Sequence, residues 1–297
     1  MSSYEKRGYL NSDFRLFHLT DTKAQDIDYH YHDFHKIIIF IRGNVKYLIE
    51  GVTYQLKPYD ILLVNRDELH KPVIDPAVPY ERIIVYLSPA FITSYRTEEY
   101  DLSRCFSYAR EKKSNVLRIN ASRKNTLLTK IHALEQACSD REYAGSLLKQ
   151  LIFLEFMVHL NRAADSSQLE YIIPTTQKDP RILELLSYIN SHLTSPLDIQ
   201  TLSSVCHLSR YHMMHLFKEE TGCTIGTYIS NKRLMLARDL VMESSQDSPI
   251  TQICYDCGFQ NYSAFSRAYK QFFGQSPREH KKQKNANSNT VSPLLLP

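Results

Sequence analysis

Apolar residues recur at helical spacing near the C-terminal end of the chain. Ile250, Ile253 and Cys257 fall on one face of a helix that ends at Gly258. Asn261 is a good N-cap for a second helix. The apolar stripe of this second helix consists of Phe265, Ala268, Tyr269 and Phe272. Two short helices joined by a tight turn with glycine predict a helix-turn-helix, whose second helix enters the major groove of DNA.

The same pattern occurs a second time, 52 residues upstream. From the cap onward Ser209 matches Asn261 and Phe217 matches Tyr269, while before the cap the offset is 51. The chain therefore carries two related helix-turn-helix units. Residues 227–242, between the units, are predicted to form one long helix. Such a helix would hold both recognition helices at a fixed separation, so that they enter successive major-groove segments on one face of the DNA.

The N-terminal part of the chain has a different pattern, in which short apolar runs alternate with turn signals. Strand-like runs occupy residues 36–42, 45–49, 52–56, 61–64 and 80–87. Short strands separated by Gly, Pro, Asn and Asp predict a sandwich or a small barrel. Residues 120–164 are predicted to be helical, and their apolar stripes could pack on the barrel, on a partner subunit, or on both.

A change of composition separates these two parts. Residues 163–178 are rich in Ser, Gln and Thr and are predicted to form an interdomain linker, after which Asp179-Pro180 opens a helix. We therefore expect an α+β protein, with an N-terminal β-sandwich or small β-barrel with packing helices and an all-α C-terminal domain with two helix-turn-helix motifs joined by a long helix. The expected boundaries are an N-terminal domain at 1–164, a linker at 165–178, a DNA-binding domain at 179–284 and a disordered tail at 285–297.

The helix-turn-helix sequences closely resemble a known family. The stretch from Ile250 to His280 contains Gly258-Phe259, Phe265-Ser-Arg and Gly274-x-Ser-Pro, and it resembles the signature of the AraC/XylS family of bacterial transcription regulators. The upstream unit, followed by Tyr228, Arg233, Ala237 and Leu240, resembles that family's first unit and linker helix. The sequence departs from the signature at Cys254, Tyr269 and His280, where the family usually has Ala, Phe and Tyr.

The resemblance implies which residues contact DNA. The family's base-contacting positions fall on Tyr211, Met214, His215, Tyr262, Ser263, Ser266 and Arg267. Arg210 and Lys218 lie on the same face of the first recognition helix, opposite Met213, Leu216 and Phe217, and Lys270 lies on the second. Arg267 is the favoured base contact, because arginine pairs bidentately with guanine. Tyr211 and Met214 are expected to contact thymine methyls or sugars, whereas Lys218 and Lys270 either contact phosphate or remain solvated.

The N-terminal sequence more loosely resembles the cupin-type sensor domain found in many members of this family. The resemblance rests on His30-x-His32, Gly43, Gly51, Pro58-x-Asp60 and His70. It implies that residues 1–164 form a cupin-like β-barrel with packing helices, which serves as the sensor and dimerisation domain. It also implies that His30, His32, Tyr47 and His70 line an effector pocket.

The three histidines could also hold a metal ion through their imidazoles. Cupin metalloenzymes have a glutamate shortly after the His-x-His pair, where this chain reads His35-Lys36-Ile37. We therefore predict neither metal nor cofactor. The alternative is a metal-dependent cupin enzyme fused to a DNA-binding domain.

Composition adds modest constraints. Of the 297 residues, 43% are hydrophobic and 23% charged, as in soluble globular proteins. Six cysteines and no apolar leader suggest the cytoplasm, and no apolar run is long enough to cross a membrane. The net charge of +4 is a weak signal for nucleic acid, but residues 261–284 carry six basic residues against Glu279. These basic residues are Arg267, Lys270, Arg278, Lys281, Lys282 and Lys284.

Catalytic motifs find little support in the sequence. It contains no glycine-rich phosphate loop, no Gly-x-Ser-x-Gly and no metalloprotease helix motif. Cys254-x-x-Cys257 lacks the second pair that a four-cysteine zinc site needs, so we predict a packing role for both thiols. We therefore predict that the protein is not an enzyme.

These observations predict a sequence-specific DNA-binding transcription regulator, by family resemblance an activator. Its expected partners are double-stranded DNA, a small-molecule effector such as a carbohydrate, a second copy of the chain, and RNA polymerase. No membrane partner is expected. A repressor that senses nothing is disfavoured, because the barrel would have its own pocket.

Overall fold

The computed structural model describes residues 5–6, 10, 12–22, 27, 29–66, 68–112, 114–118, 121–165, 170–171, 179–244 and 248–288. The chain divides into two compact units, Met1–Lys178 and Asp179–Pro297. Each unit is described separately below. In the described part of the chain, none of the helices has the length and apolar composition that crossing a bilayer requires.

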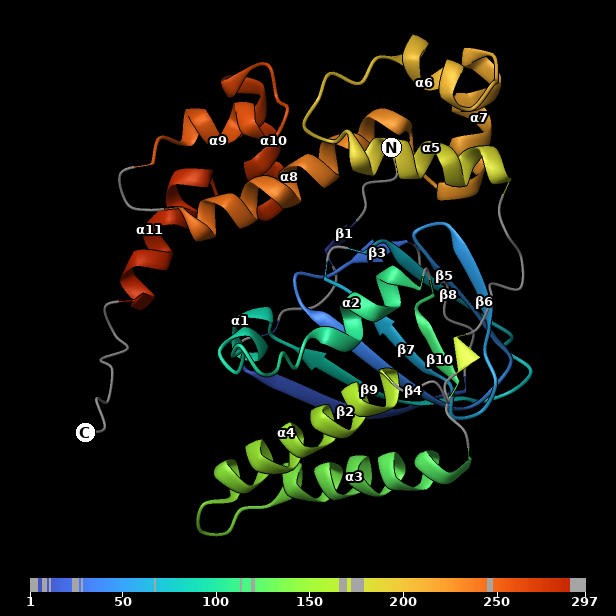
Figure 1. The fold of residues 1–297 in the computed structure, drawn as a ribbon, viewed down its shortest axis with the longest axis vertical. Coiled ribbons are helices and arrows are strands. Elements are labelled where there is room, and N and C mark those ends of the chain that lie inside the picture. The colour runs from blue at the N-terminus through green and yellow to red at the C-terminus, as the bar shows by residue number, and fades with distance from the viewer. Residues whose placement is uncertain are drawn as a thin grey trace. The chain divides into compact units, whose positions relative to one another are not determined.

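Two β-sheets form the centre of the N-terminal unit (Figure 1). The larger sheet has the strand order β11 (Glu170–Tyr171), β10 (Val116–Arg118), β7 (Ile61–Val64), β4 (His35–Arg42), β9 (Tyr80–Leu87) and β2 (Phe14–Asp21). The smaller sheet has the order β1 (Glu5–Lys6), β3 (His30–Tyr31), β8 (His70–Ile74), β5 (Val45–Ile49) and β6 (Val52–Gln55). Neighbouring strands are antiparallel, apart from the parallel pair of β1 and β3.

Strand β4 is buried on both of its faces. Ile37 and Ile39 belong to a core that the large sheet shares with the helices. Ile38 and Phe40 belong to a second core, which lies between the two sheets. Because side chains alternate along a strand, a strand with two apolar environments needs a continuous apolar run. By the same alternation Lys36 points toward the space between the sheets.

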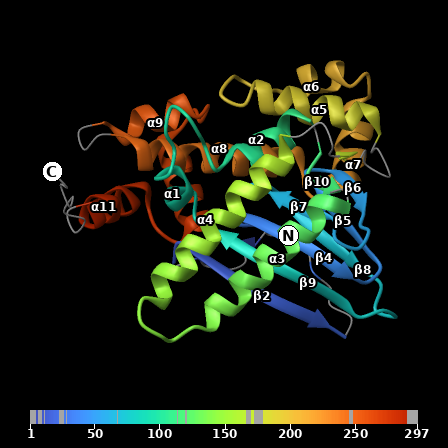
Figure 2. The same cartoon turned by 60° about the horizontal axis from the view of Figure 1, so that its bottom comes forward.

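Four helices accompany the large sheet, namely α1 (Pro89–Thr93), α2 (Arg104–Glu111), α3 (Ala121–Ser139) and α4 (Gly145–Ala164). Figure 2 shows α3 and α4 running side by side across this sheet. Phe14 of β2 stacks on Phe153 of α4, with 4.0 Å between the ring centroids. The opposite side of α4 leaves Leu147, Leu148 and Leu151 about half exposed, at 55%, 46% and 55%. The apolar surface of α4 is therefore only partly used by its own unit.

Among residues 179–244 and 248–288, the C-terminal unit contains helices but no strand, and it is organised along one long helix, α8 (Ile225–Glu243). Helices α5 (Pro180–Ser191), α6 (Ile199–Val205) and α7 (Arg210–Thr221) gather at one end of α8, and α9 (Ile250–Asp256), α10 (Tyr262–Phe273) and α11 (Pro277–Ser288) gather at the other (Figure 1). The core at the second end consists of Leu234, Ala237, Val241, Ile253, Cys254, Cys257, Phe265 and Tyr269. The predicted α+β class and the two helix-turn-helix units joined by a long helix are confirmed.

Sequence reasoning missed several strands. Strands β4, β5, β6, β7 and β9 were predicted, but the sequence has no clear periodicity where β2 lies. Seven of the eight β2 residues, all except Phe14, are partly or fully exposed, so β2 has no clean alternation to detect. The short strands β8 and β10 were also missed.

The predicted boundaries need two corrections. Within the expected linker at 165–178, Glu170–Tyr171 pairs with β10 as strand β11, and most of the remainder lies outside the described residues. Residues 285–288 of the expected disordered tail continue α11, since no Gly or Pro interrupts the chain there. The rest of the tail also lies outside the described residues.

Arg233 of α8 ties the two halves of the C-terminal unit together. Its Nε donates to the carbonyl of Leu193 at 2.8 Å, and its Nη2 donates to the carbonyl of Ser195 at 2.7 Å. The turn of the second helix-turn-helix passes directly over this contact. A Cβ on Gly258 would lie 2.9 Å from the carbonyl oxygen of Thr194 and 3.0 Å from the Arg233 guanidinium. Gly258 also has φ +82°, so this turn needs glycine for its conformation and for its close approach.

Tyr269 and His280, two of the positions that depart from the family signature, form a hydrogen-bonded pair. The Tyr269 ring is completely buried, and its hydroxyl lies 2.9 Å from Nδ1 of His280 on α11. A buried tyrosine hydroxyl needs such a partner. The histidine at position 280 therefore accommodates the tyrosine at position 269.

We expect Gly258→Ala to lower the free energy of unfolding of residues 179–288 by at least about 1–2 kcal/mol, because the left-handed conformation disfavours a Cβ and the carbonyl of Thr194 obstructs it. Gly226→Ala is the matched control. A Cβ there meets nothing within 4 Å, and the position is helical, so this variant should be as stable as the wild type or slightly more stable. Urea unfolding measures both; equal stability of the two variants would contradict the close approach at Gly258.

A double-mutant cycle tests the Tyr269–His280 pair. Tyr269→Phe should lower the free energy of unfolding by about 1 kcal/mol, and His280→Tyr should lower it by at least as much, because each removes one partner of a buried hydrogen bond. The double variant should lose clearly less than the sum of the two losses. Strictly additive losses would show that the two side chains do not interact.

Candidate DNA-binding surface and effector site

The two recognition helices, α7 and α10, are built in the same way. The Ser209 hydroxyl caps α7 by accepting from the backbone N–H of His212 at 3.3 Å, and the Asn261 side chain caps α10 by accepting from Ala264 at 2.9 Å. Both helices end at a glycine in the left-handed conformation, Gly222 with φ 76° and Gly274 with φ 77°. The predicted duplication of the motif is thus confirmed at its caps and its ends.

Helix α7 exposes the side chains that the sequence assigned to DNA. Met213 and Phe217 are buried and Leu216 is partly buried. The opposite face carries Arg210, Tyr211, Met214, His215 and Lys218, all of them exposed. Tyr211 is 78% exposed and Met214 44%, although both side chains are large and apolar. Two such residues on a solvent-facing helix are consistent with a surface that packs against a groove.

Arg210 is held in place before any DNA is bound. Its guanidinium donates to the side-chain oxygen of Gln200 on α6, with 2.8 Å from Nε. This contact joins the two helices of the first motif. Arg210 therefore has a structural partner as well as its place on the exposed face.

Helix α10 divides the predicted contact residues into two groups. Ser263, Arg267 and Lys270 are exposed, whereas Tyr262 and Ser266 are partly buried. The Tyr262 ring packs against the domain core, 6.1 Å from the ring of Phe265. The exposed members of this predicted set are therefore a polar side chain and two cations, which suits a surface that faces nucleic acid.

The basic patch predicted at the end of the chain is smaller than its sequence suggests. Arg278 and Lys282 are exposed, but Lys281 is only 8% exposed and donates to the backbone carbonyl of Ser248 at 2.6 Å. Lys281 thus fastens α11 to the segment before α9, and its assignment to the solvent-facing patch is wrong. Lys284 has a side chain outside the described residues.

Cys254 and Cys257 are both buried in the core around α8, as expected for packing residues. Burial raises the pKa of both thiols, that of Cys257 to about 12. A raised pKa disfavours the thiolate that nucleophilic chemistry requires at neutral pH.

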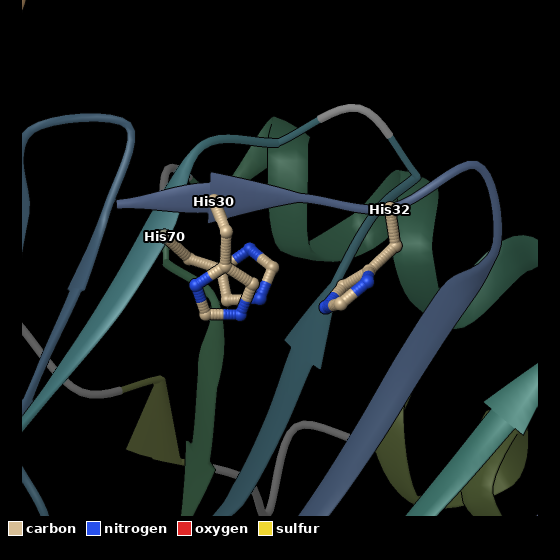
Figure 3. A group of neighbouring side chains, drawn as sticks. All are labelled: His30, His32 and His70. Carbon is tan, nitrogen blue, oxygen red and sulfur yellow. The ribbon is translucent and has the colours of Figure 1, made fainter. Parts of the chain in front are cut away.

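The predicted effector residues gather inside the N-terminal unit. His30 of β3 pairs across the strands with His70 of β8, and His32 follows β3 on the same side (Figure 3). The ring centroids of His30 and His70 are 4.3 Å apart, and each lies 5.0 Å from that of His32. Tyr47 of β5 stacks on His70 at 6.1 Å. All four side chains are at least 94% buried, so they form a polar cluster inside an apolar unit.

Lys36 of β4 completes this cluster. Its Nζ lies 2.7 Å from Nε2 of His32 and 3.1 Å from Nε2 of His70. Nδ1 of His70 is 2.8 Å from the backbone carbonyl of Glu68, which can only accept. Nδ1 therefore carries the proton, and Nε2 of His70 accepts a hydrogen bond from the lysine.

Burial sets the protonation of the cluster. It lowers the pKa of Lys36 to about 7, with a further contribution from Arg82, and it lowers the pKa of His70 well below its ordinary value. Arg82 itself is paired with Asp21 at 2.6 Å. Burial also raises the pKa of Tyr47, which keeps this phenol protonated at neutral pH. The cluster thus combines three imidazoles and a phenol with one amine, and it offers several hydrogen-bond donors and acceptors.

Lys36 is the member of this site that sequence reasoning missed. In the sequence it was noted only as part of His35-Lys36-Ile37, the stretch where cupin metalloenzymes have a glutamate. Lys36 could have been found from its position directly before the apolar run Ile37–Ile41. Because side chains alternate along a strand, Lys36 lies on the same face as Ile38 and Phe40, which faces the space between the sheets. A charged residue at a buried strand position needs a polar partner, and here the histidines provide it.

Comparisons with known proteins agree with both units. Residues 16–152 match the family model of an AraC-like ligand binding domain, and residues 202–283 match a helix-turn-helix domain. The HTH-type transcriptional activator RhaS of Enterobacter sp. (strain 638) is 25% identical over 271 residues, which are 87% of this chain and 88% of that protein. The probable transcriptional regulator LumQ of Photobacterium leiognathi is 24% identical over 270 residues, or 90% and 95% of the two chains.

Among solved structures, a transcriptional regulator with an AraC-type DNA-binding domain from Chromobacterium violaceum is similar to the C-terminal part. It is 30% identical and has a TM-score of 0.33, and the match covers 35% of this chain and 92% of that one. The two family models together account for most of the chain, in the order ligand-binding domain and then helix-turn-helix domain. The protein therefore belongs to the AraC/XylS family and is a DNA-binding transcription regulator.

Proposed function

We propose that the protein activates transcription in the cytoplasm when a small metabolite, with carbohydrates as the favoured class, binds its N-terminal unit. The observation that carries this proposal is the coupling, in one chain, of an AraC-like ligand binding domain to two exposed recognition helices. The RhaS relatives are named as transcriptional activators, which supports the direction of regulation. An activator of this kind would act by engaging RNA polymerase at the promoter.

The proposed effector site is the cluster of His30, His32, Tyr47 and His70. Its imidazole and phenol groups can donate and accept hydrogen bonds, and such groups fix the orientation of a ligand in an otherwise apolar site. A carbohydrate presents several hydroxyls, each of which is both donor and acceptor. The chemistry of the cluster therefore supports a neutral, hydroxyl-rich ligand.

The proposed DNA contact uses α7 and α10 in successive major-groove segments. Arg267 of α10 would read a base, and Lys270, one turn later, would meet a phosphate. On α7, Tyr211, Met214 and His215 would make the equivalent contacts, because they share the exposed face of that helix.

The proposed assembly is a homodimer formed through the exposed side of α4. Leu147, Leu148 and Leu151 form an apolar strip on this helix. A second copy of the chain presents the same strip, so the two strips can pair around a twofold axis. A dimer would place two C-terminal units on one DNA site and strengthen binding through effective concentration.

Mapping the protein's binding sites across the genome of its source tests the function as a whole. We expect a small number of sites upstream of genes whose expression falls when the protein is deleted. Metabolites that the products of those genes act on should raise the thermal stability of the purified protein, and His32→Ala should remove this effect. Sites whose neighbouring genes rise on deletion would instead indicate a repressor.

Substitutions of Arg267 and Lys270 distinguish a contact that sets sequence specificity from a contact that adds affinity for any DNA. Arg267→Ala should cost about 1–3 kcal/mol at the best site and relax the preference at one or two base pairs. Lys270→Ala should weaken all sequences alike and lower the log–log salt dependence by about one unit. Binding-site selection at two salt concentrations measures both effects. The orientation proposed for α10 is wrong if Arg267→Ala leaves the selected site unchanged while Lys270→Ala alters it.

Leu151→Glu tests the proposed dimer. A charge in the middle of an apolar interface should convert the dimer to a monomer in sedimentation equilibrium, and it should weaken DNA binding about 10²-fold or more through the loss of effective concentration. Val78→Glu is the matched control, since Val78 is 41% exposed in the turn after β8. It should remain dimeric. A dimeric Leu151→Glu variant would place the interface elsewhere.

A further inference from the structure

Lys36 lies where a metal ion would lie in a three-histidine site. The candidate ligand atoms of His30, His32 and His70 are all within 4.8 Å of one another. Two of these histidines direct Nε2 at the Lys36 Nζ, from 2.7 and 3.1 Å. The lysine nitrogen thus uses the same lone pairs that a metal ion would use.

The histidine cluster also has the supporting contact that metal ligands need. Metal-binding histidines usually donate their second ring N–H to a carbonyl or a carboxylate, which fixes the tautomer and aims the other nitrogen at the ion. His70 does this through Nδ1 and the carbonyl of Glu68, at 2.8 Å. A zinc ion bound to three imidazoles at about 2.0–2.1 Å would require the rings to move closer by about 1 Å. Three buried imidazoles and an open fourth position are a known donor set for zinc.

We propose that the amine of Lys36 takes the place of a metal ion in a latent three-histidine site, so that the sensor unit excludes divalent transition metals while the lysine is present. A metal ion cannot share this position with Nζ, because the amine occupies the two Nε2 lone pairs. The lysine backbone is fixed in the middle of the large sheet, where Lys36 pairs with Val64 of β7 and Tyr86 of β9. Arg82, on the neighbouring strand, adds positive charge that disfavours a second cation.

Lys36 changes which ligands the histidine cluster can bind. The amine supplies a hydrogen-bond donor at the position that a cupin metal would otherwise occupy, and it is provided by the chain itself. Replacing Lys36 with a small neutral residue removes the amine and leaves the three imidazoles available. Metal exclusion by Lys36 requires neither the proposed effector nor DNA.

Metal titration of the full-length, untagged chain after chelator treatment tests the proposal. The variants are Lys36→Ala, the double variant Lys36→Ala/His70→Ala, and the control Lys46→Ala, which removes an exposed lysine from β5. Cobalt(II) absorption reports tetrahedral nitrogen coordination, and equilibrium dialysis against zinc counts the bound ions. The double variant lacks one of the three histidines of the site, so any zinc that it still binds measures the background from surface histidines.

We expect Lys36→Ala to bind one additional equivalent of zinc, at least about tenfold more tightly than the wild type, the Lys46→Ala control or the double variant. Zinc should raise the unfolding temperature of Lys36→Ala alone. Should Lys36→Ala fold only with metal, recovery of its circular dichroism spectrum on zinc addition supports the proposal, and failure to recover counts against it. A wild-type chain that binds zinc at this site as tightly as Lys36→Ala, or a folded Lys36→Ala that binds no more than the wild type, would overturn the proposal.

Discussion

The contact of Arg233 with the loop after α5 is the constraint on which the DNA-binding unit depends. Two helix-turn-helix motifs act together only if their separation and relative rotation are fixed. Helix α8 spans the distance, but its ends could still rotate against the motifs that they carry. Arg233 limits this rotation, since one guanidinium binds the carbonyls of Leu193 and Ser195 while the Gly258 turn packs against it. A charge-assisted bond to fixed carbonyls at a partly buried site holds this geometry better than apolar packing alone.

The N-terminal unit depends on a comparable constraint at β4. One face of this strand packs in the apolar layer under the helices, and its other face packs in the apolar layer between the sheets. Its continuous apolar run supplies the side chains for both layers. Lys36, at the start of the run, brings one amine into the interior, and the only way to bury it is to surround it with acceptors. His32, which follows β3, and His70 of β8 meet this need, so the polar cluster is as much a requirement of the fold as a candidate binding site.

The sequence predicted those features that depend on local periodicity. The caps Ser209 and Asn261 and the glycine ends of both recognition helices follow from short-range rules, and the structure contains them. Strand β2 was missed because much of it is exposed and its apolar residues do not alternate. Contacts between distant segments were also missed, for example the bond from Lys281 to Ser248 and the pair of Tyr269 and His280. Nothing in local spacing encodes such contacts, so only the folded chain could show which charges are free to face DNA.

Footprinting of residues 179–288 on a selected DNA site tests most directly whether α8 holds the two recognition helices as one binding surface. If it does, hydroxyl-radical cleavage should show two protected blocks on one face of the duplex, with centres one helical turn apart, about 10–10.5 base pairs. Both blocks should appear at the same protein concentration, because the motifs bind as a unit. A single protected block, or two blocks that appear independently or lie on opposite faces, would contradict this account.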